Sequence, residues 1–199
     1  MAKNSYETKL VNLVKKADSI RGCVKDGYIY VSVDDHAIIK MVDSTYNGML
    51  LSKMGIYYIK TNAGKYDMIK GNFVQVLYTV PDKLTKLFDF IKEDIFMSKF
   101  IYMDDDKEVV LYPYNGHLQA IQKKYYDIMK NMNSPFWTEK GYINRIVGTY
   151  DSVNDIMFGA MPYHLEHVEV VDKIKALSDY LIDFEKKAAE WKKENSYEK

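Results

Sequence analysis

The sequence predicts an α+β fold with antiparallel β-hairpins and two helices in the N-terminal part, and a helical C-terminal part that ends in one long amphipathic helix. Turn dipeptides and alternating apolar residues dominate residues 1–115. From residue 116 onward, apolar residues recur three and four positions apart, which is the helical period. No Gly or Pro follows Pro162 before residue 193. We therefore expect an α+β domain over 1–115 and a mainly helical region over 116–199, which either packs on the first as one unit or stands apart.

The first elements are predicted by a helix cap and a hairpin turn. Ser5 is a suitable N-cap for a first helix. The expected buried face of this helix comprises Leu10, Leu13, Val14 and Ala17. Asp26-Gly27 favours a tight turn between strands over 21–25 and 28–33. Asp34 and Asp35 then turn the chain into a strand over 37–42.

The middle of the chain continues the same α+β pattern. Asn47-Gly48 predicts a further turn, and Pro81 predicts the start of a second helix. The predicted strands cover 56–60, 66–69, 73–80, 95–103 and 108–112. The last two form a hairpin whose tip contains Asp104, Asp105, Asp106 and Lys107. Beyond it we expect helices over 118–132 and 153–161, separated by a short β-like segment over 142–147.

Residues 161–193 carry the most regular apolar pattern of the chain. Its positions are His167, Val170, Ile174, Leu177, Leu181, Phe184, Ala188 and Trp191. The spacing alternates between three and four, which is typical of a coiled-coil seam. A helix of roughly 28 residues is about 42 Å long, close to the diameter of about 40 Å expected for a globule of this size. Such a helix must cross the body as a core helix or project from it to meet a partner.

Composition narrows the classes of function. The 28 basic and 28 acidic side chains give a net charge of zero, so overall charge does not favour nucleic acid or an anionic membrane as partner. Cys23 is the single cysteine, which excludes an intrachain disulfide and favours a reducing, intracellular location or a place in a virion. The N-terminus has no apolar signal region, and no apolar run is long enough to span a membrane. Phosphate-loop and dinucleotide motifs are absent, so we expect no cofactor.

One pair of histidines suggests metal chemistry. His164 and His167 are three residues apart, a spacing that places both imidazoles on one helix face, where they can bind Zn²⁺. The HExxH signature is absent, and a capping, interface or surface role is the more common explanation of such a pair. A metal-dependent hydrolase that uses either this pair or the acidic hairpin tip is one alternative function.

Two stretches resemble one domain of the DNA sliding-clamp family in the order of their elements. They are ETKLVNLVKKADSIRGCVKDGYIYVSVDDHAIIKMV and FVQVLYTVPDKLTKLFDFIKEDIFMSKFIYMDDDKEVVLY, within residues 5–115. The resemblance implies helices that face the DNA backbone, with phosphate contacts from Lys9, Lys15, Lys16, Lys83 and Lys86. Residues 116–199 do not repeat the pattern, and the second helix also carries acidic residues, including Asp82, Asp89, Glu93 and Asp94. A clamp-like processivity factor is therefore the second alternative.

The sequence favours a non-enzymatic interaction or assembly protein, such as a subunit of a viral or phage structural particle. Its expected partner is another protein or a second copy of the chain, bound through the C-terminal helix. The residues expected to form that contact are Ile174, Leu177, Leu181, Phe184 and Trp191. The eighteen tyrosines fit this interpretation, because Tyr is favoured at interfaces, although a tyrosine-rich core edge looks the same in sequence.

Overall fold

The computed structural model describes residues 5–80, 83–98, 100–104, 106–165, 177, 179–184, 186–187 and 190. Its helices are α1 (Tyr6–Lys15), α2 (Thr45–Met54), the 3₁₀ helix η1 (Tyr57–Lys60), α3 (Lys83–Lys86) and α4 (Lys123–Met129). The strands from the first half are β1 (Ser19–Lys25), β2 (Tyr28–Val33), β3 (Ala37–Val42), β4 (Gly64–Ile69), β5 (Asn72–Leu77), β6 (Lys92–Asp94) and β7 (Ile101–Asp104). The remaining strands are β8 (Lys107–Tyr114), β9 (His117–Gln122), β10 (Trp137–Glu139), β11 (Val147–Asp151) and β12 (Ile156–Ala160).

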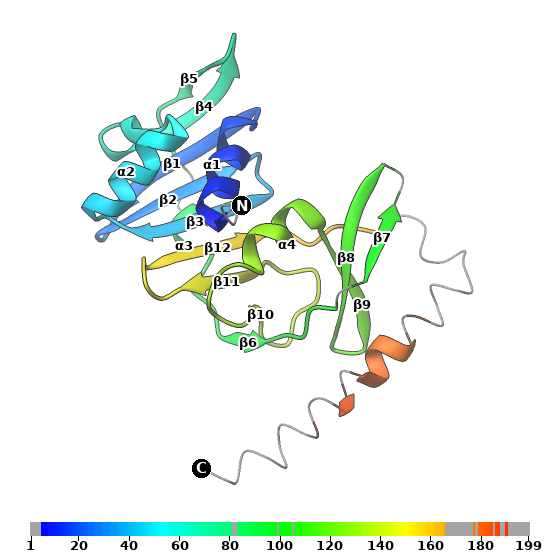
Figure 1. Cartoon of the computed structure of the whole chain (residues 1–199). Coiled ribbons are helices and arrows are strands. Elements are labelled where there is room, and N and C mark those ends of the chain that lie inside the picture. The colour runs from blue at the N-terminus through cyan, green and yellow to red at the C-terminus, as the bar shows by residue number, and fades with distance from the viewer. Residues whose placement is uncertain are drawn as a thin grey trace.

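These strands form two antiparallel sheets, which confirms the α+β class (Figure 1). The larger sheet has nine strands in the order β5-β4-β1-β2-β3-β12-β11-β10-β6, and the smaller has three in the order β7-β8-β9. β12 pairs with β3 from Ala37 opposite Ala160 to Met41 opposite Ile156. One sheet therefore unites strands from both of the regions that the sequence predicts.

The β1-β2-β3 meander follows the turn chemistry of the sequence. Asp26 and Gly27 both have positive φ, 52° and 77°, as a two-residue hairpin turn requires. Asp34 and Asp35 also have positive φ where β2 turns into β3. The Ser5 side chain accepts a hydrogen bond from the Thr8 N–H at 3.4 Å, so the predicted cap of α1 is confirmed.

The nine-stranded sheet has a core on each face. Ile29 and Val31 point to one face, where they pack with apolar residues of α1, α2 and α4. Tyr30 points to the other face, where it packs with Leu84 of α3 and with Trp137. Successive side chains of a strand alternate between faces, so α1 and α3 lie on opposite sides of the sheet.

Several predictions in the first half are wrong: the described residues of 1–115 form α1, α2, η1 and α3 rather than two helices, and residues 95–98 are not in a strand. Asn47-Gly48 is not a turn but part of α2, because Ser44 caps that helix and accepts from the Asn47 N–H at 3.2 Å. The Asn47 side chain also donates to the Val42 carbonyl at 2.9 Å, which ties the helix start to β3. Residues 57–60 form η1 rather than a strand.

The prediction of a mainly helical region from residue 116 is wrong over 116–165. Asn115 and Gly116 have positive φ and close a β-hairpin, so 117–122 is strand β9, and α4 covers only 123–129 of the expected helix. Residues 153–161 form a turn and strand β12 instead of a helix. The apolar residues of 117–122 and of 153–161 fit both the helical and the strand period, because each segment is short. Pairing with a neighbouring strand decides which structure forms.

The long C-terminal helix is not shown. Residues 161–165 are not helical, and the Tyr163 N–H donates to the Ala120 carbonyl at 2.8 Å, so the helix does not begin at Pro162. Within 177–190, the described residues are helical. The rest of the predicted helix lies outside the described residues. Among the helices that the structure describes, none combines the length and the hydropathy needed to cross a bilayer.

Candidate interaction surfaces

The C-terminal helical segment packs on the three-stranded sheet of its own chain. Leu181 is only 2% exposed and lies in a cluster with Val109, Leu111 and Ala120 of β8 and β9. Leu177 packs against the same cluster. Burial of a leucine side chain contributes about 2 kcal/mol, so this contact holds the segment on the sheet.

An aromatic hollow lies beside this contact. Its volume is about 370 Å³, and we define it by the residues that line it, which are Phe96, Met97, Ser98, Phe100, Tyr180, Leu181 and Phe184. The rings of Phe96 and Phe184 stack at a tilt, with their centroids 4.8 Å apart. Phe100 is 48% exposed and Tyr180 is 59% exposed. Aromatic rings at the rim of a hollow are the anchors that protein interfaces favour.

The structure separates the residues that the sequence places in one interface. Leu181 is buried against its own sheet, whereas Phe184 is 39% exposed at the aromatic hollow. Ile174 and Trp191 lie outside the described residues. Sequence analysis did not identify Phe96 and Phe100 as surface residues, because their segment has the pattern of a hairpin strand; the structure gives them an irregular conformation before β7.

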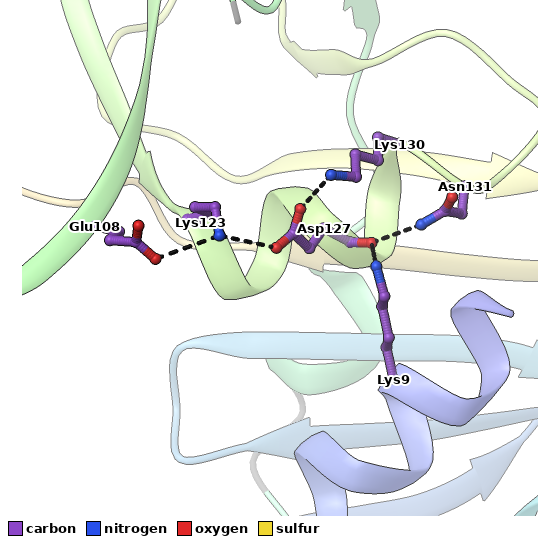
Figure 2. Close-up of polar contacts among 6 residues, drawn as sticks. All are labelled: Lys9, Glu108, Lys123, Asp127, Lys130 and Asn131. Atoms are coloured by element: carbon purple, nitrogen blue, oxygen red, sulfur yellow. Dashed lines mark hydrogen bonds and ion pairs between the residues drawn. The ribbon is translucent and has the colours of Figure 1, made fainter. Parts of the chain in front are cut away.

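A second surface is rich in lysine and centres on Asp127 of α4 (Figure 2). The Asp127 carboxylate pairs with Lys123 at 3.5 Å and with Lys130. Lys9 of α1 donates to the Asp127 backbone carbonyl at 2.8 Å. Lys123 also pairs with Glu108 of β8 at 3.3 Å. These contacts join α1, α4 and β8 into one polar surface.

The charge states of this network follow from its contacts. Burial alone would raise the pKa of Asp127, but the hydrogen bond from Lys130 and the charges of Lys123 and Lys9 outweigh it and hold that pKa below its usual value. The hydrogen bond to Glu108 and the nearby Asp127 raise the pKa of Lys123. The aspartate therefore stays ionised and the lysine stays charged over the physiological pH range.

Two adjoining hollows, of about 430 and 420 Å³, flank this network and share Lys124 and Asp127. Five lysines line them, and we call these the lysine surface: Lys9, Lys16, Lys107, Lys123 and Lys124. Three acids line the same hollows, namely Asp34, Glu108 and Asp127. The excess of lysines gives this surface a local positive charge on a chain that has no net charge.

The five lysines expected to face DNA do not share one surface. Lys9 and Lys16 belong to the lysine surface, and Lys15 lines a separate hollow with Leu50 and Lys53 of α2. Lys83 and Lys86 belong to α3, on the opposite side of the nine-stranded sheet. The structure thus groups Lys9 and Lys16 with Lys107, Lys123 and Lys124, which sequence analysis did not single out.

The predicted metal pair is only half described. His164 is exposed, and His167 lies outside the described residues. Over the part of the chain that the structure describes, no three His, Cys, Asp or Glu side chains come together as a metal-ion site.

A buried polar cluster fastens α1 to the turn between β11 and β12. Tyr6 donates its hydroxyl hydrogen to Asp151, and the Asn154 amide donates to Asp151 at 2.8 Å. The Val153 N–H donates to the other carboxylate oxygen at 3.0 Å. Burial alone would raise the pKa of Asp151, but these hydrogen bonds outweigh burial and lower it. Burial and the bond to Asp151 raise the pKa of Tyr6, so the phenol stays protonated.

Comparisons of this chain with protein-family models, with curated proteins and with solved structures found no match.

Proposed function

We propose that this protein is a non-enzymatic assembly protein, a subunit that associates with further copies of itself through the aromatic hollow. The observation that carries the proposal is the cluster of exposed rings at that hollow, where Phe96, Phe100, Tyr180 and Phe184 surround about 370 Å³ of open space. Exposed apolar side chains that gather at one place are a feature of interaction sites. A structural particle built from repeated subunits is the kind of complex that this surface suits.

The charge of the chain supports a second copy as the partner. Its 28 basic and 28 acidic side chains balance, so two copies approach without net repulsion. Aromatic anchors then supply the binding energy, since a small number of buried rings carries most of the free energy of a typical interface.

Replacing Phe184 with aspartate tests this interface. Phe184 is partly exposed, so the fold tolerates the change, while the carboxylate would be buried without a partner if the hollow were covered. We expect the dissociation constant to rise about 30-fold, corresponding to a loss of about 2 kcal/mol. Light scattering on a sizing column would measure the change as a lower mass at a fixed protein concentration.

The matched control is Lys186→Asp, which places the same carboxylate on an exposed position of the same helical segment. It should leave the mass unchanged. Leu181→Asp is a poorer test, because Leu181 is buried against its own sheet and the change would detach the segment. An unchanged mass in Phe184→Asp would contradict the proposed interface.

The lysine surface favours a second candidate function, in which the protein binds the nucleic-acid backbone as a clamp-like factor would. The specific observation is that Lys9 of α1 and Lys16, the residue that follows α1, line the same hollow as Lys124 of α4. Lysine binds phosphate as a point charge and reads no base sequence, so binding should fall steeply with salt concentration.

Two double variants, one on each face of the nine-stranded sheet, test whether the lysine surface binds DNA. We expect Lys16→Glu combined with Lys124→Glu to abolish retention on DNA-cellulose at low salt, because two phosphate contacts become repulsive. Lys83→Glu combined with Lys86→Glu makes the same change in net charge on the opposite side of the sheet and should retain binding. The lysine surface would be ruled out as a DNA site if both double variants lost the same share of their retention on DNA-cellulose. The same conclusion would follow if the wild type were not retained.

A further inference from the structure

The β4–β5 hairpin projects from the body of the protein and ends the nine-stranded sheet (Figure 1). Its outer strand, β5, has no strand beyond it among the described residues. Val74 is 43% exposed and Val76 is 47% exposed, and Ile69, Leu77 and Tyr78 are exposed as well. An exposed apolar strand at the edge of a sheet is a ready template for pairing with another chain.

The backbone of β5 offers hydrogen bonds at its outer edge. Lys70 and Gly71 have φ of 49° and 82° and form a two-residue turn, so Ile69 and Asn72 make the first hydrogen-bonded pair. Pairs alternate along antiparallel strands, so Phe73 and Gln75 direct their N–H and C=O groups away from β4. The structure fits this alternation at Met68, which lies opposite Phe73. The Met68 N–H points away from β5 and donates to the Asp18 carbonyl at 2.7 Å.

The sequence of this edge lacks the usual protection against pairing. Residues 71–80 contain no charged side chain, and the first proline comes at position 81. Natural edge strands commonly carry lysine or proline to prevent association. On β4, Lys65 and Asp67 pair with each other at 3.2 Å, so their charges are matched within the hairpin. Two copies of this edge can therefore meet without repulsion between like charges.

We propose that β5 pairs antiparallel with β5 of a second copy, about a two-fold axis at Val74. Phe73 of each copy then lies opposite Gln75 of the other, and the two pairs exchange four backbone hydrogen bonds. The two Val74 side chains meet at the axis in a non-hydrogen-bonded pair, where side chains come closest. The nine-stranded sheet continues from one copy into the next.

A β-bulge sets the length of this contact. β5 carries one extra residue at Val76, between Gln75 opposite Tyr66 and Leu77 opposite Lys65. A bulge bends and twists the strand, so regular pairing covers Asn72 to Gln75. The exposed Val76 and Leu77 lie immediately beyond this paired stretch.

This contact is isologous and lies at a different part of the chain from the aromatic hollow. A subunit with two separate interfaces can extend into a larger assembly, whereas one isologous interface stops at a dimer. The proposal goes beyond the proposed function and does not depend on it, because β5 alone can form a dimer.

Mass measurements on matched variants test the β5 interface. Val74→Lys places two like charges opposite each other at the axis and should raise the dissociation constant of this contact about tenfold or more. Val153→Lys is the control, since Val153 is 79% exposed in the turn between β11 and β12. Analytical ultracentrifugation over a range of concentrations should show dissociation in the first variant and none in the second. A mass that is unchanged by Val74→Lys would overturn the proposal.

Combining Val74→Lys with Phe184→Asp separates this proposal from the proposed function. If both interfaces exist, each single variant leaves a smaller complex and the double variant is a monomer. If Phe184→Asp has no effect and Val74→Lys alone gives a monomer, the β5 interface stands and the aromatic hollow fails. If Val74→Lys has no effect and Phe184→Asp alone gives a monomer, the aromatic hollow stands and the β5 interface fails.

A cysteine at the axis provides a direct readout of the pairing. Cys23 is the single native cysteine, so Cys23→Ala gives a cysteine-free background. In that background, Val74→Cys should form a disulfide-linked dimer on mild oxidation, since the two side chains are close enough for the bond. Asp67→Cys, on β4 opposite Val74, should form none because β5 separates it from the second copy. Equal cross-linking at both positions, or none at Val74→Cys, would overturn the two-fold axis at Val74.

Discussion

Replacing Asp151 with alanine is expected to lower the free energy of unfolding by about 3 kcal/mol. The carboxylate is buried and accepts hydrogen bonds from Tyr6, Asn154 and the Val153 N–H. Alanine leaves the buried Tyr6 hydroxyl without its acceptor and opens a polar gap under α1. Urea denaturation followed by circular dichroism would measure the loss at neutral pH.

The same substitution has a predictable pH dependence. The folded-state pKa of Asp151 lies below the value of about 3.9 for an unfolded chain. Its stabilising contribution is therefore complete above pH of about 4 and is lost as the pH falls through the folded-state pKa. The difference in unfolding free energy between wild type and Asp151→Ala should shrink at acid pH. A difference that stays constant from neutral to acid pH would show that the charge of Asp151 does not stabilise the fold.

Replacing Gly148 with alanine is expected to cost about 3 kcal/mol through overpacking. A Cβ at this position of β11 would clash with the Trp137 ring and would lie 2.7 Å from the backbone oxygen of Phe158. The Trp137 ring cannot move away freely, because Phe88 and Phe90 contact it with centroids 5.7 and 5.8 Å away. Thermal unfolding should show a clearly lower midpoint for the variant.

Gly48→Ala is the matched control for this prediction. Gly48 lies inside α2, where a Cβ would be 3.4 Å from the Tyr57 ring, an ordinary contact distance. Alanine in a helix interior is favoured over glycine by about 1 kcal/mol, so this variant should be more stable than the wild type. Equal losses in Gly148→Ala and Gly48→Ala would mean that contact with Trp137 does not limit the size of residue 148.

The sequence predicts the fold well where local turn chemistry decides the structure. A two-residue hairpin turn requires positive φ at both positions, which Asp and Gly tolerate. Asp26 and Gly27 adopt it, and the predicted β1-β2 hairpin is present. Between residues 116 and 160, by contrast, the outcome depends on distant partners. Ile121 fits a helical period with Tyr125, yet it lies on β9 and pairs with Val110. A short apolar pattern fits both strand and helix, so pairing decides between them.

The candidate surfaces show a similar limit. Helical spacing places Leu181 on an apolar face, and the structure buries this residue, but spacing does not say what covers that face. The covering surface is the chain's own three-stranded sheet, and the exposed rings beside it come partly from an irregular segment. The edge position of β5 likewise depends on the order of nine strands, which no local pattern encodes.

The mass of the wild-type chain in solution, measured by light scattering over a series of protein concentrations, tests the proposed assembly function most directly. The chain has a mass of 23.3 kDa. We predict a mass that exceeds this value and rises with concentration, and that falls when Phe184 is replaced with aspartate. A mass of 23.3 kDa at every concentration would contradict the proposal that the protein assembles with copies of itself.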